Sequence, residues 1–390
     1  MNFLRPHGEK LYAAIDIGTS SVSAIIFSLV QEKGTLKPFI KNLYRISLKP
    51  QPGMDGSVLA RKVVEGVEEL AHTILKETHN SFSTLYVGLS APFYVSRTIH
   101  VQAARKNPRN TITKEEIEAL IKGGEQDFLK THSNENGTLD LITRIPIRTL
   151  VNGYLMEDPV GARGARIDIS VRYEATTKEL LQRLETPFSS RIPHMRVQAV
   201  SVPQVSFSAM RRMFDTNPSI MFIDIGGEVT EVSIISEGML NDVLLVPIGN
   251  NNLLRHITET FKTSYNNAEF ILKAYVNDTL EESEKKKVAA LIDEAARVWG
   301  GNLEEGLAAP NARVFSPSVV YLAGGGARIP QYKALFDAEF RNRMRMAGEA
   351  QVISLSPSIF EGQFYKYGYF EGPEDFTLAC LALQKPGDIL

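Results

Sequence analysis

The sequence predicts an α/β fold with two similar halves, each with a hairpin that binds phosphate, and three observations carry this prediction. The tetrapeptide Ile-Asp-Ile-Gly occurs at 15–18 and again at 223–226, each time between two runs of β-forming residues. The aspartates at 16 and 224 are 208 residues apart, a spacing too wide for a solenoid repeat and suited to two large halves. A glycine triplet at 324–326 follows a third apolar run.

The composition is that of a globular protein in a reducing compartment. The chain has 390 residues, of which 43% are hydrophobic, so two or three domains with packed cores are expected. The net charge of −2 gives no general attraction to nucleic acid or to anionic lipid. Cys380 is the single cysteine, and we expect a cytoplasmic protein, because neither a signal peptide nor a membrane-spanning apolar run is visible.

The first repeat predicts a hairpin that binds phosphate. Two β-rich runs within 11–30 flank Gly18, Thr19 and Ser20. A glycine lets backbone N–H groups approach an anion closely, and the two hydroxyls can donate further hydrogen bonds. Asp16 would repel phosphate directly, so we expect it to hold hydrated Mg²⁺.

The second repeat predicts an equivalent hairpin with Asp224, Gly226, Gly227 and Thr230 in the same roles. An ordinary hairpin with a Gly/Ser bend is the alternative for either stretch alone. Glu228 follows the glycines, and a carboxylate within about 4–6 Å of phosphate oxygens repels them unless a cation intervenes.

The third element predicts a contact with a purine. A buried strand at 319–322 leads into Gly324, Gly325 and Gly326, and a helix is expected from Pro330, since proline favours the first helical turn. A flat ligand can lie on glycine backbone, and Arg328 can stack on it.

The middle of the chain predicts an inserted domain. We expect a first half at 1–82, an insert at 83–187, a return with a connecting helix at 188–215, and a second half at 216–390. Within the insert a helix begins at Thr113 with a capping-box Glu116, and Gly123-Gly124 is expected to interrupt it. A second helix is expected at 177–185. The insert has no glycine-rich phosphate loop, so we expect a protein partner there.

A long amphipathic helix is predicted at 282–308 in the second half. Its apolar stripe runs at helical spacing through Val288, Leu291, Ile292, Ala295, Val298 and Trp299, and we expect this stripe, with the only tryptophan, to be core.

These motifs resemble those of the actin superfamily of ATPases. "DIGTSS", "DIGGEVTEV" and "LAGGGARIP" are similar, in order, to its two phosphate motifs and its adenosine motif. Within that superfamily "EDPVGARGARIDIS" at 157–170 and a terminal "FTLACLALQ" helix resemble FtsA, the bacterial cell-division homologue, whose distinctive insert is termed subdomain 1C. The resemblance implies an actin-like fold with two ribonuclease H-like halves.

The resemblance also implies function. ATP or ADP with Mg²⁺ would bind between the halves, and copies would polymerise through the insert and the core to organise a division or envelope machine. A tubulin-like or membrane-protein peptide would be the partner. PilM, the FtsA-like adaptor of type IV pili, is the alternative: there the insert grips a partner's peptide, and nucleotide is structural or absent.

Several residues depart from the FtsA pattern. The second phosphate motif usually reads Asp-Ile-Gly-Gly-Gly-Thr-Thr-Asp, whereas this chain has Glu228 for the third glycine and Glu231 for the last aspartate. Val202 stands at the position where many members of the superfamily have the residue that orients the attacking water. Gln204, the remaining catalytic candidate, points roughly 200° away from that position around the helix. We therefore expect at most a slow Mg-dependent ATPase, with weakened ATP binding.

Two further departures concern adenosine and the membrane. The adenosine-contacting pair would be Glu269 and Lys273, four residues apart on one helix face rather than the usual three. Pro386 and Gly387 follow the last helix in place of an amphipathic membrane-binding helix, so membrane contact is expected only through a partner. A sugar kinase of the same superfamily is disfavoured by the insert, and a DnaK-type chaperone by the short stretch after Arg328.

Overall fold

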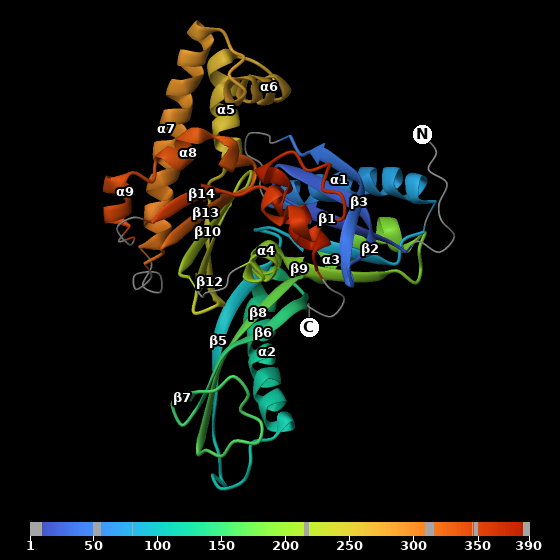
Figure 1. Cartoon of the computed structure of the whole chain (residues 1–390), viewed down its shortest axis with the longest axis vertical. Coiled ribbons are helices and arrows are strands. Elements are labelled where there is room, and N and C mark those ends of the chain that lie inside the picture. The colour runs from blue at the N-terminus through green and yellow to red at the C-terminus, as the bar shows by residue number, and fades with distance from the viewer. Residues whose placement is uncertain are drawn as a thin grey trace.

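The computed structural model describes residues 10–49, 56–79, 81–213, 218–308, 316–344, 346 and 350–384. Pro386 and Gly387 lie outside the described residues. Figure 1 shows two five-stranded sheets with their helices, and a four-stranded sheet with one long helix that extends away from both. The two large sheets and the extension correspond to the two halves and the insert that the sequence predicts.

The first sheet has the order β3-β2-β1-β4-β9. Strand β1 is antiparallel to β2 and parallel to β4, so the first repeat forms a hairpin. Neighbouring residues of β1 pack into different cores on the two faces of the sheet, which explains why β1 reads as a continuous apolar run. The strands are β1 (Leu11–Ile17), β2 (Ser21–Glu32), β3 (Thr35–Ser47), β4 (Thr84–Leu89) and β9 (Arg196–Ser201).

The second sheet repeats this plan in the order β12-β11-β10-β13-β14. It too begins with an antiparallel hairpin, β10 with β11, and continues with parallel strands. The identical order in both sheets confirms the prediction of two similar halves. The strands are β10 (Ile220–Ile225), β11 (Thr230–Ser236), β12 (Met239–Val246), β13 (Val319–Ala323) and β14 (Gln351–Ser354).

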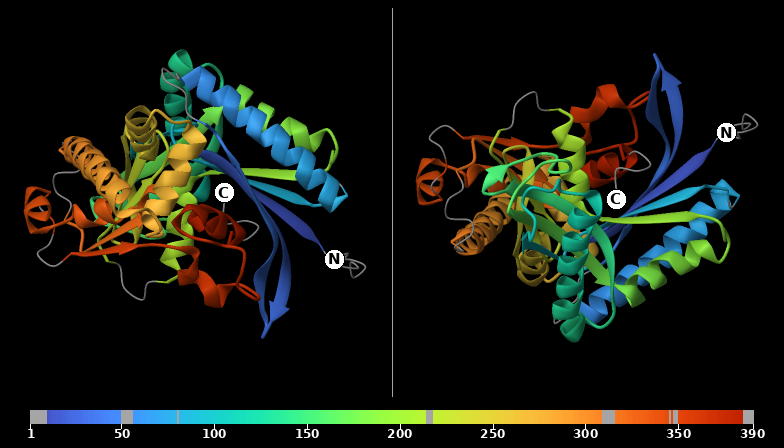
Figure 2. Two further views of the ribbon diagram at one scale, coloured as in Figure 1. Left: turned by 90° about the horizontal axis from the view of Figure 1, so that it is seen from above. Right: turned by 90° about the horizontal axis from the view of Figure 1, so that it is seen from below.

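Helices lie in three layers around these sheets (Figures 1 and 2). Helices α1 (Gly56–Thr78) and α3 (Lys178–Ser189) pack on the outer face of the first sheet. Between the sheets lie α4 (Val202–Arg211) and α10 (Phe376–Ala382), the expected terminal helix. The outer face of the second sheet carries α5 (Asn250–Phe261), α6 (Tyr265–Val276), α7 (Glu282–Leu307), α8 (Pro330–Ala334) and α9 (Ala338–Arg343). Short 3₁₀ helices span Gly325–Arg328, Pro357–Gln363 and Pro373–Asp375.

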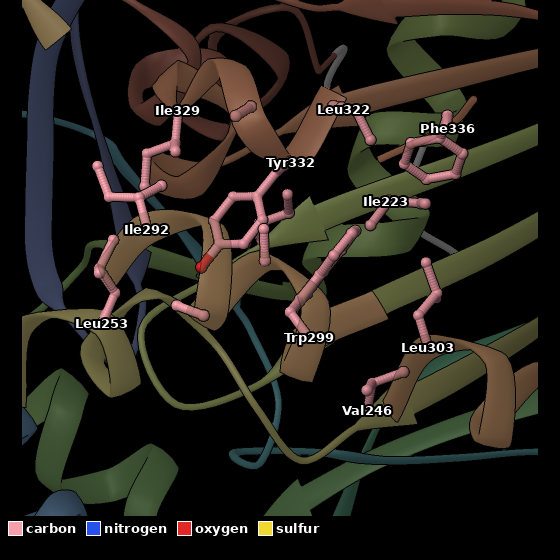
Figure 3. Packing of buried hydrophobic residues seen from close by; sticks show 14 of the residues in the cluster. Ile223, Val246, Leu253, Ile292, Trp299, Leu303, Leu322, Ile329, Tyr332 and Phe336 are labelled. Atoms are coloured by element: carbon pink, nitrogen blue, oxygen red, sulfur yellow. The ribbon is translucent and has the colours of Figure 1, made fainter. Parts of the chain in front are cut away.

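The core of the second half is built around Trp299 of α7. Its indole is fully buried and stacks at a tilt on Tyr332, with a ring separation of 5.0 Å. Figure 3 shows these rings among side chains from α7, α8 and the sheet. The helix runs almost as predicted, but Val298 is 43% exposed. The expected stripe was one residue too wide, since neighbouring positions lie about 100° apart on a helix.

The inserted sheet has the order β5-β8-β6-β7 and carries α2 on one face. Its elements are β5 (Val95–Ala104), α2 (Lys114–Asn136), β6 (Leu139–Val151), β7 (Tyr154–Leu155) and β8 (Arg166–Thr177). The side chain of Thr113 caps α2 through the Glu116 N–H, as expected. The predicted interruption at Gly123-Gly124 is wrong. A Cβ at Gly124 would lie 2.6 Å from the Tyr173 hydroxyl, so this glycine lets an unbroken helix press onto the sheet.

The inserted sheet is narrower than the predicted range of 83–187. Strand β4 pairs with β1 and β9 in the first sheet, and α3 packs on α1. Both belong to the first half, because a strand is assigned by its ladder and not by its neighbours in the sequence. Within the described residues, no helix has the length and apolarity needed to cross a membrane.

Candidate functional site

The two repeated aspartates lie where the parallel strands of each half end. Asp16 is in register with Gly88 of β4, and Asp224 with Ala323 of β13. Burial and the neighbouring Asp224 raise the pKa of Asp16 to about 8, against the opposing effect of Arg45. Burial raises the pKa of Asp224 to about 6. The halves thus bring together two carboxyls that resist ionising unless a positive charge arrives.

One oxygen of this pair is suited to a hydrated cation. Asp16 Oδ1 is enclosed and has no hydrogen-bond partner in the structure. Among the described residues, no group of three or more His, Cys, Asp or Glu side chains is placed to hold a metal ion. Two neighbouring buried carboxyls, one of them with an unpaired oxygen, fit a hydrated magnesium ion.

The glycine triplet lies against the second hairpin. Gly324 has a φ of +79°, and a Cβ there would come within 2.1 Å of Asp224 Oδ1. A Cβ on Gly326 would lie as close to the Ile225 side chain, whereas a Cβ on Gly325 would face open space. Two of the three glycines are thus required by the fold, and Gly325 leaves backbone free for a flat ligand.

The two hairpins that the sequence assigns to phosphate are hydrogen-bonded directly to each other. Thr19 Oγ1 accepts hydrogen bonds from the N–H groups of Gly227 at 3.1 Å and of Glu228 at 2.8 Å. A Cβ on Gly227 would lie 2.8 Å from the Ser20 backbone nitrogen. A phosphate group therefore has to displace the Thr19 hydroxyl to reach these two N–H groups. The N–H groups of Gly18 and Gly226 donate to carbonyls within their own turns.

The Glu228 carboxylate points toward α5. Arg255 Nη1 and Nη2 donate to it at 2.9–3.1 Å, and Asn251 Nδ2 donates at 2.9 Å. Tyr265 in turn holds Asn251 through a hydrogen bond of 3.0 Å to Oδ1. Sequence reasoning missed these partners, although Asn251 and Arg255 share a helix face four residues apart.

Thr230 has a structural role that the sequence did not predict. Its buried hydroxyl donates to the Ile248 carbonyl at 2.7 Å and accepts from Trp299 Nε1 at 2.9 Å. The expectation that Thr230 donates to phosphate is therefore wrong in this arrangement, because its only hydrogen is already used. Thr230 ties the second hairpin to the core instead.

Gln204 is held on both sides of its amide. Its Oε1 accepts from Arg172 of the inserted sheet, and its Nε2 donates to Ser208 Oγ at 3.1 Å. Val202, in the seat ahead of it, is fully buried. Neither side chain is free to orient a water molecule here, and the Arg172 contact was not visible in the sequence because 32 residues separate the partners.

The candidate adenosine contacts all lie in the second half, and one of them bonds to the first half. Glu269 of α6 accepts from Ser47 Oγ of the first half at 3.2 Å, and Lys273 is exposed on the same helix. Arg328 donates from Nε and Nη2 to the two oxygens of Glu374, at 2.6 and 2.5 Å. This fork fixes the guanidinium plane beside the triplet.

The Glu231 carboxyl bonds to the segment that leads into the insert. Tyr94, which precedes β5, donates its hydroxyl to Glu231 Oε1 at 2.7 Å. Burial, then the nearby Asp224, raise the pKa of Glu231 to about 8. The position where the FtsA motif has aspartate thus carries a longer side chain that reaches the connection to the inserted sheet.

This chain is similar in sequence to proteins of a known family. The family model "Cell division protein FtsA" matches residues 221–361. FtsA of Bacillus subtilis (strain 168) is 20% identical over 386 residues, covering 91% of this chain and 82% of that protein. FtsA of Neisseria meningitidis serogroup B (strain ATCC BAA-335 / MC58) is 22% identical over 272 residues, and the matched region covers 67% of this chain but only 61% of that protein's length.

A solved structure shares the fold over almost the whole chain. The PilM–PilN type IV pilus biogenesis complex matches with a TM-score of 0.63 at 15% identity, covering 97% of this chain and 98% of that one. The chain is thus FtsA-like and has the actin-type fold.

Proposed function

We propose that this FtsA-like chain is an actin-type, nucleotide-binding scaffold of a bacterial division or envelope machine, and that copies of it assemble through the inserted domain and the core. The carrying observation is the pair of equivalent hairpins, each with an aspartate at its strand end, that meet across the cleft. Two such hairpins with buried carboxyls suit a Mg-nucleotide bound between two halves.

The residues give the nucleotide a defined place in this proposal. Asp16 and Asp224 hold the hydrated cation, whose positive charge offsets the burial of both carboxyls. The N–H groups of Gly227 and Glu228 would hold phosphate oxygens once the Thr19 hydroxyl has left them. The Gly18 N–H donates to the Ser21 carbonyl within its own turn at 3.1 Å. A Mg-nucleotide would supply negatively charged phosphate oxygens. These oxygens would accept the hydrogen bonds in place of Thr19 and so join the halves.

Turnover is expected to be slow. Gln204 is bonded to Arg172 and Ser208, and Val202 has no polar atom in its side chain. Whether the cleft is open or closed would therefore depend more on nucleotide binding than on hydrolysis. Such a dependence suits a scaffold that changes state when nucleotide binds.

The second candidate is a PilM-like adaptor that closes its cleft without nucleotide. The Thr19 bridge favours it, since the hairpins already bond to each other directly. In this role the inserted domain would bind a membrane-protein peptide, and that partner would recruit the chain to the inner face of the membrane.

The test is calorimetric titration with ATP and with ADP, each with Mg²⁺, combined with pelleting over a range of protein concentrations. An Asp16→Asn variant removes the cation site, and Asp293→Asn on the solvent face of α7 is a matched control. Micromolar binding lost in Asp16→Asn but kept in the control, with nucleotide-dependent pelleting, is the expected result. A protein that binds neither nucleotide and stays monomeric would replace the scaffold with the adaptor.

A further inference from the structure

The segment 90–94, which leads from β4 into the inserted sheet, is hydrogen-bonded to the second hairpin. Tyr94 lies in this connection and is 5% exposed, and its hydroxyl donates to Glu231 of β11 at 2.7 Å. The segment that carries the insert therefore supplies a hydrogen-bond donor to this buried carboxyl.

A second buried contact joins the insert to the second half. Arg172 of β8 is 2% exposed, and its Nη1 donates to the Leu240 carbonyl of β12. Its Nη2 donates to Gln204 of the helix between the sheets. Arg172 Nε lies 3.3 Å from Glu174 Oε1, an ion-pair distance whose angle does not make a hydrogen bond.

These two contacts have one physical consequence. A buried hydroxyl, guanidinium or carboxyl that loses its partner keeps the full cost of desolvation. Turning the insert relative to β11 and β12 would break the bonds of Tyr94 and Arg172 without giving either group access to water. The insert and the second half are therefore expected to move together.

The connection also bonds to the first half. The N–H of Ser90 donates to the Ile17 carbonyl, at the end of the strand that carries Asp16, at 3.1 Å. On the return path Thr176 Oγ1 donates to the Phe93 carbonyl at 2.7 Å. The segment 90–94 thus contacts both hairpins. It leads the chain into the insert and also contacts the strand by which the chain leaves it.

We propose that Tyr94 and Glu231 form a latch that couples the inserted domain to the opening of the cleft, with Arg172 as its second contact. Glu231 replaces the aspartate of the FtsA motif, and the additional methylene lets its carboxyl reach Tyr94. The latch regulates the proposed nucleotide site and in that respect rests on the proposed function, although the latch itself is a property of the nucleotide-free chain.

Distances between spin labels on the insert and the second half test the latch. Cysteines replace the exposed Lys122 of α2 and Lys333 of α8, and the single native cysteine, Cys380, is fully buried and stays unlabelled. Tyr94→Phe removes the donor, and Glu231→Asp withdraws the acceptor. Tyr173→Phe is the matched control, because that buried hydroxyl donates to Ile121 within the insert.

The expected result in nucleotide-free protein is a narrow distance distribution in the parent and in Tyr173→Phe. Tyr94→Phe and Glu231→Asp should both broaden it, by at least half of its width. Equal distributions in all four proteins, each folded by circular dichroism, would overturn the latch. Because this comparison needs no nucleotide, a chain that fails to bind ATP or ADP would refute the proposed nucleotide site and leave the latch to be judged by the distances alone.

Discussion

Arg255 holds the Glu228 carboxylate with both terminal nitrogens, at 2.9–3.1 Å, and thereby directs it toward α5. A glutamate in a phosphate motif is thus neutralised by a partner one helix away. The substitution that most clearly distinguishes this hairpin from the FtsA pattern comes with its own counter-charge.

Replacing Arg255 with methionine should release this carboxylate into the cleft. The side chains are 31% and 23% exposed, so stability should fall by only about 0.5–1 kcal/mol. ATP affinity should fall more than ADP affinity, because the additional phosphate carries more negative charge. Calorimetry compares the two nucleotides, and Arg343→Met, which removes the distant pair with Glu304, is the control. Equal losses for ATP and ADP would contradict the repulsion.

Thr19→Ala should free the Gly227 and Glu228 N–H groups. The nucleotide-free protein should lose on the order of 1–2 kcal/mol, because two hydrogen bonds between the halves disappear. Nucleotide should then bind more tightly than to the parent, since no hydroxyl has to be displaced. Chemical denaturation and calorimetry measure the two effects, and Thr19→Ser, which keeps the hydroxyl, should behave like the parent. Weaker binding by Thr19→Ala would make Thr19 a phosphate ligand first.

Stability should fall as the pH rises from about 4 to about 8. The pKa values of Asp16 and Glu231 are raised to about 8 and that of Asp224 to about 6, above about 4 for an unfolded carboxyl. In this window the folded chain binds more protons than the unfolded chain, so each added pH unit favours unfolding. Thermal melts across this range measure the slope.

Asp16→Asn is the control for that slope, since it removes one of the raised carboxyls and should flatten the curve. Millimolar Mg²⁺ should stabilise the parent more at pH 8 than at pH 6, because the cation needs ionised carboxyls. A melting temperature that rises through this window would show that the cluster is ionised in the folded protein.

Trp299→Phe should weaken the second hairpin from inside the core. The substitution removes the indole N–H that Thr230 accepts at 2.9 Å, and it leaves part of a buried volume unfilled. The free energy of unfolding should drop by about 1–3 kcal/mol. Denaturation followed by circular dichroism measures it, with Tyr332→Phe as a control that keeps the ring stack. A loss no larger than that of the control would mean that the hydrogen bond contributes little.

The plan of the molecule follows from local patterns in the sequence. Repeated strand–turn–strand patterns around Asp16 and Asp224, the glycine triplet and the stripe around Trp299 depend on local geometry and on helix or strand period. Such features can be read from neighbouring residues, because backbone dihedrals and amphipathic faces are set within a few positions.

The contacts of the site residues, by contrast, follow from long-range packing. Thr19 meets Gly227 across 208 residues, Tyr94 meets Glu231 across 137, and Arg172 meets Gln204 from another sheet. Thr230 bonds to Trp299 and not to phosphate. Gly124 does not break its helix but lets that helix pack closely on the inserted sheet. In each case the outcome depends on how two sheets and an insert pack together, because a hydrogen bond forms between atoms that packing brings within about 3 Å and not between neighbours in the chain.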